Sequence, residues 1–145
     1  MESFAEQSDA AWTPLVEAAR AVRAKAYAPY SSYLVGAALS CDDGSIVVGC
    51  NVENASFGAT ICAERNAVLH AVAIGLRAFR ACVVVTQGPE PAFPCGMCRQ
   101  VLSEFARELP ILLVGESTGA RRVVMLSQIF PASFGADDLA HLVRR

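Results

Sequence analysis

Cys62-Ala63-Glu64-Arg65 and, further along the chain, Pro94-Cys95-Gly96-Met97-Cys98 are the two segments that decide the fold and the chemistry expected of this protein. Three cysteines in this arrangement can supply three thiolate ligands to a zinc ion and leave its fourth tetrahedral position open. Glu64 follows the first cysteine by two positions, so its carboxylate can exchange protons with a molecule in the open position without coordinating the metal. The pattern therefore predicts a zinc site that activates water rather than a structural zinc site.

Both segments are expected to begin helices. The sequence pattern predicts helices over residues 62–73 and 97–108, with the cysteines at their starts. The unpaired N–H groups and partial positive charge of a helix N-terminus lower thiol pKa values and favour thiolates. Three thiolates leave Zn²⁺ with a formal charge of −1, so we expect the two helix ends and the guanidinium of Arg65 to offset this charge.

Each of these residues also has a simpler interpretation. Taken alone, Cys62 would be an inert buried cysteine, Glu64 a first-turn carboxylate that stabilises the helix dipole, and Arg65 a solvated side chain. The presence of a C-x-x-C pair at a second helix start favours the metal interpretation for all three. A redox-active pair is disfavoured because a thioredoxin-like motif follows the first strand of its fold, whereas Cys95 lies two-thirds along this chain.

Composition places the chain among ordinary globular proteins. Its 145 residues are 54% hydrophobic and 18% charged, which predicts a single domain over residues 1–145 with frayed residues at 1–9. The net charge of −2, without a basic stripe, favours a small ligand over nucleic acid. Six cysteines are too few for a disulfide scaffold. The acidic N-terminus and the short apolar runs predict a cytoplasmic protein that does not enter membranes.

Outside the two cysteine helices, strands and helices alternate. We expect a first helix over residues 10–26 with Pro14 in its first turn, a hairpin of strands over 35–40 and 46–51, strands over 81–86, 111–114 and 121–125, and a terminal helix near 137–143. This order predicts an α/β fold in which a mixed five-stranded sheet is covered by helices on both faces, in three α/β/α layers.

The remaining cysteines and the histidines are predicted to have no part in the site. Cys41, Cys50 and Cys82 fall in expected strands, where cysteine behaves as a small apolar residue. His70 and His141 lack ligand spacing to the three cysteines and are expected to have ordinary structural roles.

At this point the chain resembles the cytidine deaminase family, in its short, single-domain, zinc-dependent form. The resemblance is carried by five segments: Ala28-Pro29-Tyr30-Ser31, Val35-Gly36-Ala37-Ala38, Gly49-Cys50-Asn51-Val52-Glu53-Asn54-Ala55, Cys62-Ala63-Glu64-Arg65 and Pro94-Cys95-Gly96-Met97-Cys98-Arg99-Gln100. The first motif is Cys-Ala-Glu rather than the His-x-Glu of most nucleic-acid-editing deaminases, which indicates a free nucleoside as substrate.

The resemblance implies hydrolytic deamination of cytidine and deoxycytidine to uridine and deoxyuridine plus ammonia, a reaction of pyrimidine salvage. It implies one Zn²⁺ per subunit on Cys62, Cys95 and Cys98. Glu64 would take a proton from the attacking water, protonate N3 and deliver a proton to the leaving amine. It further implies a homotetramer with active sites at the subunit interfaces.

Substrate-binding residues follow from the same resemblance. Asn51 and Glu53 match the pair that hydrogen-bonds the ribose, and alternate residues leaving a strand do face the same way. Tyr33 matches the aromatic residue packed against the pyrimidine, and the Ala63 N–H is expected to orient the base. Phe134 matches an aromatic residue that relatives send into a neighbouring subunit's site.

Several alternatives remain open from the sequence. For residues 51–54 the alternative is a strand-end turn without a ligand. A deaminase of cytosine-containing antibiotics shares both metal motifs, but Asn51 and Glu53 favour a nucleoside. A deaminase that edits RNA or DNA would need a basic surface. A non-catalytic zinc-binding module would need a closed fourth coordination position.

Overall fold

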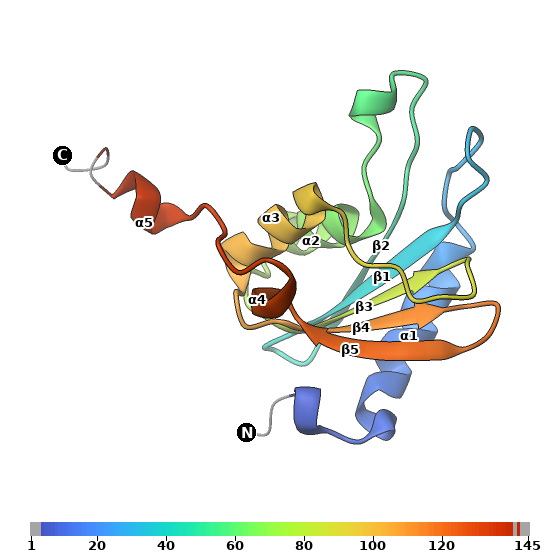
Figure 1. Ribbon diagram of the computed structural model, residues 1–145, viewed down its shortest axis with the longest axis horizontal. Coiled ribbons are helices and arrows are strands. Elements are labelled where there is room, and N and C mark those ends of the chain that lie inside the picture. The colour runs from blue at the N-terminus through green and yellow to red at the C-terminus, as the bar shows by residue number, and fades with distance from the viewer. Residues whose placement is uncertain (1–3, 141, 143–145) are drawn as a thin grey trace.

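The computed structural model describes residues 4–140 and 142. It contains one mixed five-stranded sheet with the order β2-β1-β3-β4-β5 (Figure 1). The strands are β1 (Val35–Cys41), β2 (Ile46–Cys50), β3 (Phe79–Thr86), β4 (Pro110–Gly115) and β5 (Ala120–Met125). The helices are η1 (Phe4–Glu6), α1 (Asp9–Arg23), η2 (Phe57–Ala59), α2 (Ala63–Ala73), α3 (Gly96–Phe105), α4 (Leu126–Ile129) and α5 (Ala136–Leu139).

Strand direction brings the two cysteine helices to one edge of the sheet. β1 pairs antiparallel with both β2 and β3, so β2 and β3 run in the same direction although they are not neighbours. β3 pairs parallel with β4, and β5 closes the sheet antiparallel to β4. Because α2 follows β2 and α3 follows β3, the two connecting segments leave the sheet at the same edge, where the carboxyl ends of β2 and β3 lie.

Helices cover both faces of the sheet, which confirms the predicted three-layer α/β/α arrangement. On one face α1 buries an apolar stripe that includes Trp12, Val16 and Ala19 against inward residues of β1, β3 and β4. On the other face α2 and α3 bury Val68 and Leu102 against the opposite sides of the same strands. The central strands β3 and β4 are buried along nearly their whole lengths, as their unbroken apolar runs predict.

Several predicted boundaries were wrong by a few residues. The first helix ends at Arg23 rather than 26, and it begins at Asp9, which puts Pro14 in its second turn. The third predicted helix ends at Phe105, because Ala106 adopts an extended conformation. The terminal helix covers Ala136–Leu139, and the rest of the predicted span includes positions 141 and 143, outside the described residues.

The N-terminal segment packs against α1 and β3. Within residues 1–9, Phe4–Glu6 form η1, and the Phe4 ring packs edge-on against Trp12 with 5.2 Å between ring centroids. The Arg80 guanidinium carbon lies 5.6 Å from the centroid of the same ring. Residues 1–3 lie outside the described part of the chain.

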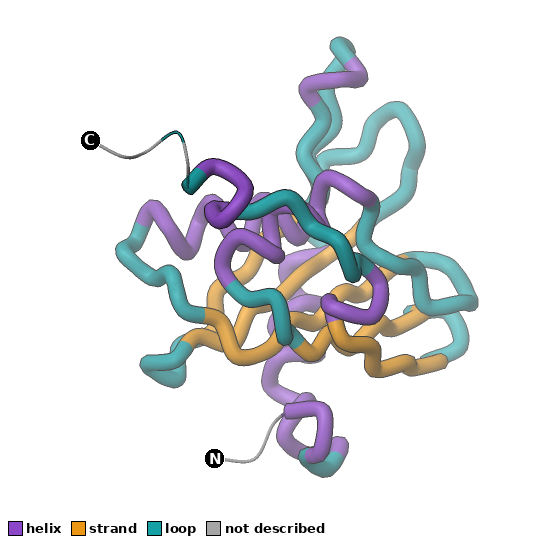
Figure 2. The backbone as a smooth tube through the Cα atoms, turned by 60° about the vertical axis from the view of Figure 1, so that its left-hand side comes forward, coloured by secondary structure: helices purple, strands orange, loops and turns teal. Residues whose placement is uncertain are grey.

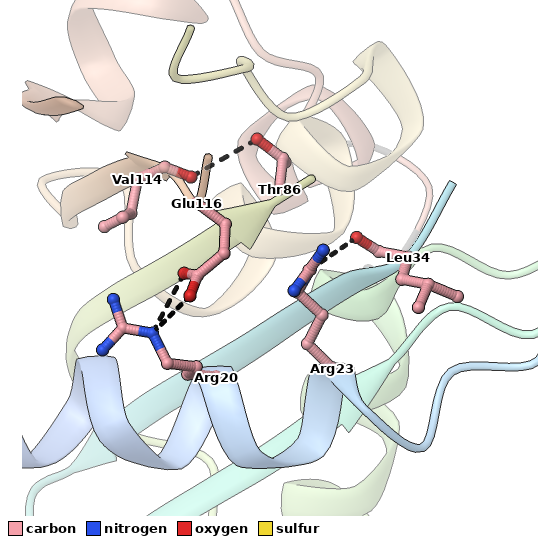
Figure 3. Close-up of polar contacts among 6 residues, drawn as sticks. All are labelled: Arg20, Arg23, Leu34, Thr86, Val114 and Glu116. Atoms are coloured by element: carbon pink, nitrogen blue, oxygen red, sulfur yellow. Dashed lines mark hydrogen bonds and ion pairs between the residues drawn. The ribbon is translucent and has the colours of Figure 1, made fainter. Parts of the chain in front are cut away.

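Two long loops project from the edge where the cysteine helices begin. They connect α1 to β1 and β2 to α2, and both stand clear of the sheet in Figures 1 and 2. The end of α1 anchors this edge (Figure 3): Arg20 contacts both carboxylate oxygens of Glu116, and Arg23 donates to the Leu34 carbonyl at 3.0 Å. Across residues 4–140 and 142, every helix is too short or too polar to cross a lipid bilayer.

Candidate active site

The three cysteines of the two motifs meet at the starts of α2 and α3. Cys62 and Cys95 are the residues immediately before these helices, and Cys98 lies in the first turn of α3. The Cys62 and Cys95 sulfurs are 3.8 Å apart, and all three sulfurs lie within 4.8 Å of one another. This spacing suits three thiolate ligands around one metal ion.

Glycine at position 49 allows α2 to approach β2 closely at the metal-ligand end of the helix. A Cβ atom at Gly49 would overlap the Ala63 carbonyl oxygen and the Ala67 amide nitrogen. Because Ala63 follows Cys62 directly, the position of the first sulfur depends on this contact between backbones.

The charge distribution around the sulfurs fits a bound cation. A hydrogen bond from the Cys98 thiol, with further contributions from Arg65 and Cys95, lowers the pKa of Cys62 to about 5. The same contact with Cys62, together with burial, raises the pKa of Cys98. One thiolate therefore forms readily, while the neighbouring thiol resists ionisation beside it. A divalent cation removes this conflict because it stabilises all three thiolates at once.

Arg65 turns back toward the sulfurs from the first turn of α2. Its Nη2 atom lies 3.7 Å from the Cys62 sulfur and donates to the Thr60 carbonyl at 3.2 Å. Its Nε atom is buried and has no hydrogen-bond partner among the described residues. This guanidinium thus places a positive charge beside a group of thiols that carries excess negative charge when ionised.

Glu64 lines a cavity beside the three cysteines. Its side chain is only 5% exposed, and burial raises its pKa to about 7. The cavity has a volume of about 210 Å³. It is lined by Tyr33, Val35, Asn51, Thr60, Cys62, Ala63, Glu64, Val84, Thr86, Ala92, Phe93 and Cys95. A carboxyl group with this pKa exchanges protons readily near neutral pH, as a general acid and base must.

Asn51 holds one wall of this cavity in place. Its Oδ1 atom accepts a hydrogen bond from the Val35 N–H at 2.8 Å, and its Nδ2 atom donates to the Tyr33 carbonyl at 2.7 Å. The intervening residue, Leu34, is held by Gln87 and Arg23 through its own N–H and carbonyl groups. The Tyr33 side chain is 41% exposed at the mouth of the cavity.

Glu53 faces an adjoining hollow rather than the cavity itself. This hollow has a volume of about 370 Å³ and is lined by Tyr30, Ser31, Glu53, Phe57 and Thr60. The Glu53 carboxylate accepts hydrogen bonds from the N–H groups of Tyr30 and Ser31 and from the Ser31 hydroxyl, and these contacts lower its pKa. The structure therefore brings Asn51 and Glu53 to neighbouring spaces that share Thr60 as a common wall.

Phe134 lies apart from the cavity in the described chain. Its side chain is 57% exposed, and its carbonyl accepts a hydrogen bond from Gln100 Nε2 at 2.9 Å. It belongs to the C-terminal segment between α4 and α5, which Figure 1 shows extending away from the sheet. Of the other predicted site residues, Cys98 and Arg65 line neither hollow: Cys98 belongs to the group of three sulfurs, and Arg65 contacts the Cys62 sulfur. The remaining ones line one of the two hollows.

Thr60 and Thr86 line the cavity although the sequence did not single them out. Thr60 precedes the first metal motif by two residues. Thr86 is the last residue and the only hydroxyl-bearing one in strand β3, and its hydroxyl donates to the Val114 carbonyl at 3.3 Å (Figure 3). A polar residue directly after the apolar run at 81–85 was the available signal for Thr86.

The other cysteines and His70 take no part in this group of thiols. Cys41 and Cys82 are buried in the core as predicted, whereas Cys50 is half-buried at the end of β2. His70 Nδ1 lies 3.1 Å from the Val48 carbonyl, about two helical turns beyond Cys62. His141 lies outside the described residues.

Comparison with known proteins identifies the family. The model of the cytidine and deoxycytidylate deaminase zinc-binding region matches residues 12–113. A cytidine deaminase of Sporosarcina psychrophila is 40% identical over 128 residues, which cover 88% of this chain and 93% of the relative. One of Mycobacterium tuberculosis is 43% identical over 133 residues, covering 90% and 95%.

Solved structures agree with the sequence relatives. The crystal structure of cytidine deaminase from Burkholderia pseudomallei matches with a TM-score of 0.81 and 45% identity, covering 88% of this chain and all of that one. The Mycobacterium tuberculosis enzyme matches with a TM-score of 0.75 and 39% identity, covering 89% and 99%. The fold, the three-cysteine group and these matches together show that the chain belongs to the cytidine deaminase family.

Proposed function

We propose that this protein catalyses the zinc-dependent hydrolytic deamination of cytidine and deoxycytidine to uridine and deoxyuridine plus ammonia, as a step of pyrimidine salvage. The observation that carries the proposal is the buried Glu64 carboxyl group, which lines a cavity beside three thiols. Cytidine deaminases of comparable length, covered over more than nine-tenths of their sequences, support the same reaction for this chain.

Cys62, Cys95 and Cys98 would hold one Zn²⁺ per subunit, as the family's zinc-binding region and the sulfur spacing support. When bound, the ion supplies Lewis acidity that makes water a better nucleophile. Arg65 would reduce the electrostatic cost of three adjacent thiolates, because its guanidinium already contacts the Cys62 sulfur.

Glu64 would move the protons of the reaction. As a carboxylate it accepts a proton from the water that attacks C4 of the cytosine ring, and it delivers this proton to N3. After the C4–O bond has formed, it passes the second proton of the former water to the amino nitrogen, and the C4–N bond breaks to release ammonia. The buried setting that raises its pKa to about 7 suits both transfers.

The two neighbouring hollows would receive the two parts of a nucleoside. We assign the cytosine ring to the cavity beside Glu64, where Tyr33 would pack against it and the Ala63 N–H, unpaired within its helix, would orient it. We assign the sugar to the side of Asn51 and Glu53, which border the two spaces on either side of Thr60. This two-part shape favours a nucleoside over free cytosine.

We further propose that residues 1–145 form a single domain that assembles as a homotetramer with sites at the subunit interfaces. Aromatic side chains around the hollow that Glu53 faces are exposed, Phe57 to 75%, which supports the burial of this surface by another copy of the chain. Phe134, exposed and away from its own cavity, would then complete a neighbour's site. We propose a cytoplasmic location, where thiols stay reduced. The mass of the zinc-loaded protein in solution tests the assembly.

The experiment that tests the function combines zinc analysis with ammonia release. Purified protein should contain one zinc per chain and release ammonia from cytidine and from deoxycytidine. Ammonia release from a cytosine-containing nucleoside antibiotic but not from cytidine would contradict the assigned substrate. Zinc binding without ammonia release from any cytosine nucleoside would contradict catalysis altogether.

A further inference from the structure

Asn66 and Arg99 occupy the same position relative to the two cysteine helices. Each lies four residues after the cysteine that precedes its helix, and each donates its backbone N–H to that cysteine's carbonyl at 3.0 Å. Both side chains are partly buried and turn back past the helix start. Each reaches the carbonyl group of the residue that comes just before the cysteine.

Asn66 links the first cysteine loop to the end of β2. Its Nδ2 atom donates to the Cys50 carbonyl at 2.8 Å and lies 3.4 Å from the Ile61 carbonyl. Ile61 immediately precedes Cys62, and Cys50 immediately precedes Asn51. A single amide group therefore ties the peptide before a metal ligand to the peptide before a residue that lines the substrate cavity.

Arg99 makes the corresponding link for the second loop. Its Nε atom donates to the Pro94 carbonyl at 2.8 Å, and its Nη1 atom donates to the Ile129 carbonyl at 2.9 Å. Pro94 immediately precedes Cys95, and Ile129 ends α4, thirty residues beyond Arg99. Hydrogen bonds from a guanidinium are stronger than those from a neutral donor, so this loop is held against the C-terminal part of the chain.

We infer that Asn66 and Arg99 are paired positioning residues that hold the two metal-ligand loops at the spacing a metal requires. The inference rests on the proposed function, in which Cys62 and Cys95 bind zinc. Rotation of the peptide before either cysteine would swing its sulfur away from the other two. Both side chains act on that peptide rather than on a sulfur, which separates them from Arg65.

The test compares zinc release from variants of the zinc-loaded protein. Asn66→Asp removes the Nδ2 donor without changing the side chain's size. Arg99→Gln removes the guanidinium group that donates to two carbonyls. Matched controls lie on the same helices: His70→Ala loses a contact with the Val48 carbonyl on β2, and Ser103→Ala loses a hydrogen bond to the Gln100 carbonyl. Zinc transfer to a coloured chelator is followed for each protein.

We expect Asn66→Asp and Arg99→Gln to release zinc about 10-fold faster than the wild type, because partners of metal ligands typically contribute 10- to 100-fold to metal affinity. The controls should release zinc at the wild-type rate. The absorption bands of the cobalt-substituted protein should shift in the two variants only. Asn66→Ser and Arg99→Lys each keep a hydrogen-bond donor, so their rates of zinc release should lie between those of the wild type and the first two variants. If Asn66→Asp or Arg99→Gln folds poorly, these two variants are used for the test instead.

The possible outcomes separate this inference from the proposed function. Variants that match their controls in both zinc release and cobalt spectra, in a wild-type background that binds zinc and deaminates cytidine, would overturn the positioning role alone. A wild-type protein that binds no zinc would contradict the proposed function on which the role depends.

Discussion

The starts of α2 and α3 are built alike but lie in opposite surroundings. Both have a cysteine as the preceding residue and a side chain four positions later that returns to the loop. At the start of α2, Ala63 and Glu64 are buried against β2 and the core. At the start of α3, Gly96 and Met97 face outward, and Met97 is 62% exposed.

This difference separates two tasks within one site. The buried start of α2 supplies the carboxyl group and the guanidinium, whose effects are strengthened by low local dielectric. The start of α3 supplies the buried Cys98 sulfur and the exposed Cys95, which lines the cavity. The cavity must stay open on this side for a substrate to enter. Substitutions at the first start should therefore have larger effects than those at the second.

The largest effect is expected at Glu64. Glu64→Gln keeps the shape of the side chain but cannot accept a proton, so cytidine turnover should fall by about 10³- to 10⁴-fold. Zinc content should remain at the wild-type level because Glu64 lies outside the group of three sulfurs. The measurements are ammonia release and metal analysis on the same preparation. A turnover number close to that of the wild type would contradict the claim that the start of α2 contributes more to the reaction than the start of α3.

The close approach of α2 to β2 should be the next most sensitive feature. Gly49→Ala forces a methyl group into the backbone of Ala63 and Ala67, so the free energy of unfolding should fall by about 1–3 kcal/mol. Gly88→Ala is the matched control, because an added Cβ there would make only an ordinary contact, 3.9 Å from the Glu90 carbonyl oxygen. Urea unfolding of the zinc-loaded proteins at one protein concentration measures both. Equal stability of the two variants would show that the contact with β2 does not support the start of α2.

Arg65 should have a moderate effect that appears in the acidity of the thiols. In the metal-free protein the pKa of Cys62 is about 5, so its thiolate exists above that pH and is lost as the pH falls below it. Arg65→Gln removes a favourable charge and should raise this pKa by about one unit, leaving the contribution of the Cys98 hydrogen bond in place.

Thiolate absorbance recorded against pH in chelator-treated protein measures the shift. Ser103→Ala is the control on α3, since its hydroxyl donates to the Gln100 carbonyl rather than to a sulfur. An unchanged pKa of Cys62 in Arg65→Gln would contradict the assignment of the favourable charge to the start of α2.

The smallest effect is expected at Met97. Met97→Gln alters an exposed side chain at the start of α3, so the free energy of unfolding should change by less than about 0.5 kcal/mol, with zinc content unchanged. The same urea titration measures it. A loss of more than 1 kcal/mol, on the order of a core substitution, would mean that this helix start is covered in solution.

Local patterns in the sequence predicted the thiol positions, while tertiary contacts escaped prediction. Cys62 and Cys95 could be placed at helix starts because helical periodicity follows each of them directly. The hydrogen bond from Asn66 to the Cys50 carbonyl could not be predicted, because it depends on the close approach of α2 to β2. Helix ends were also missed: Phe105 is followed by extended backbone without a glycine to mark the stop.

The division of the site between α2 and α3 has a consequence for the time course of synthesis. Cys62 emerges 33 residues before Cys95, an interval of about 2–7 seconds at ordinary elongation rates. During this interval β3, the strand that brings α3 to the shared edge, is also being made. A nascent chain therefore offers a passing metal ion one thiol of the three. Binding by all three thiols therefore has to wait until Cys98 has been made and β3 has paired with β1.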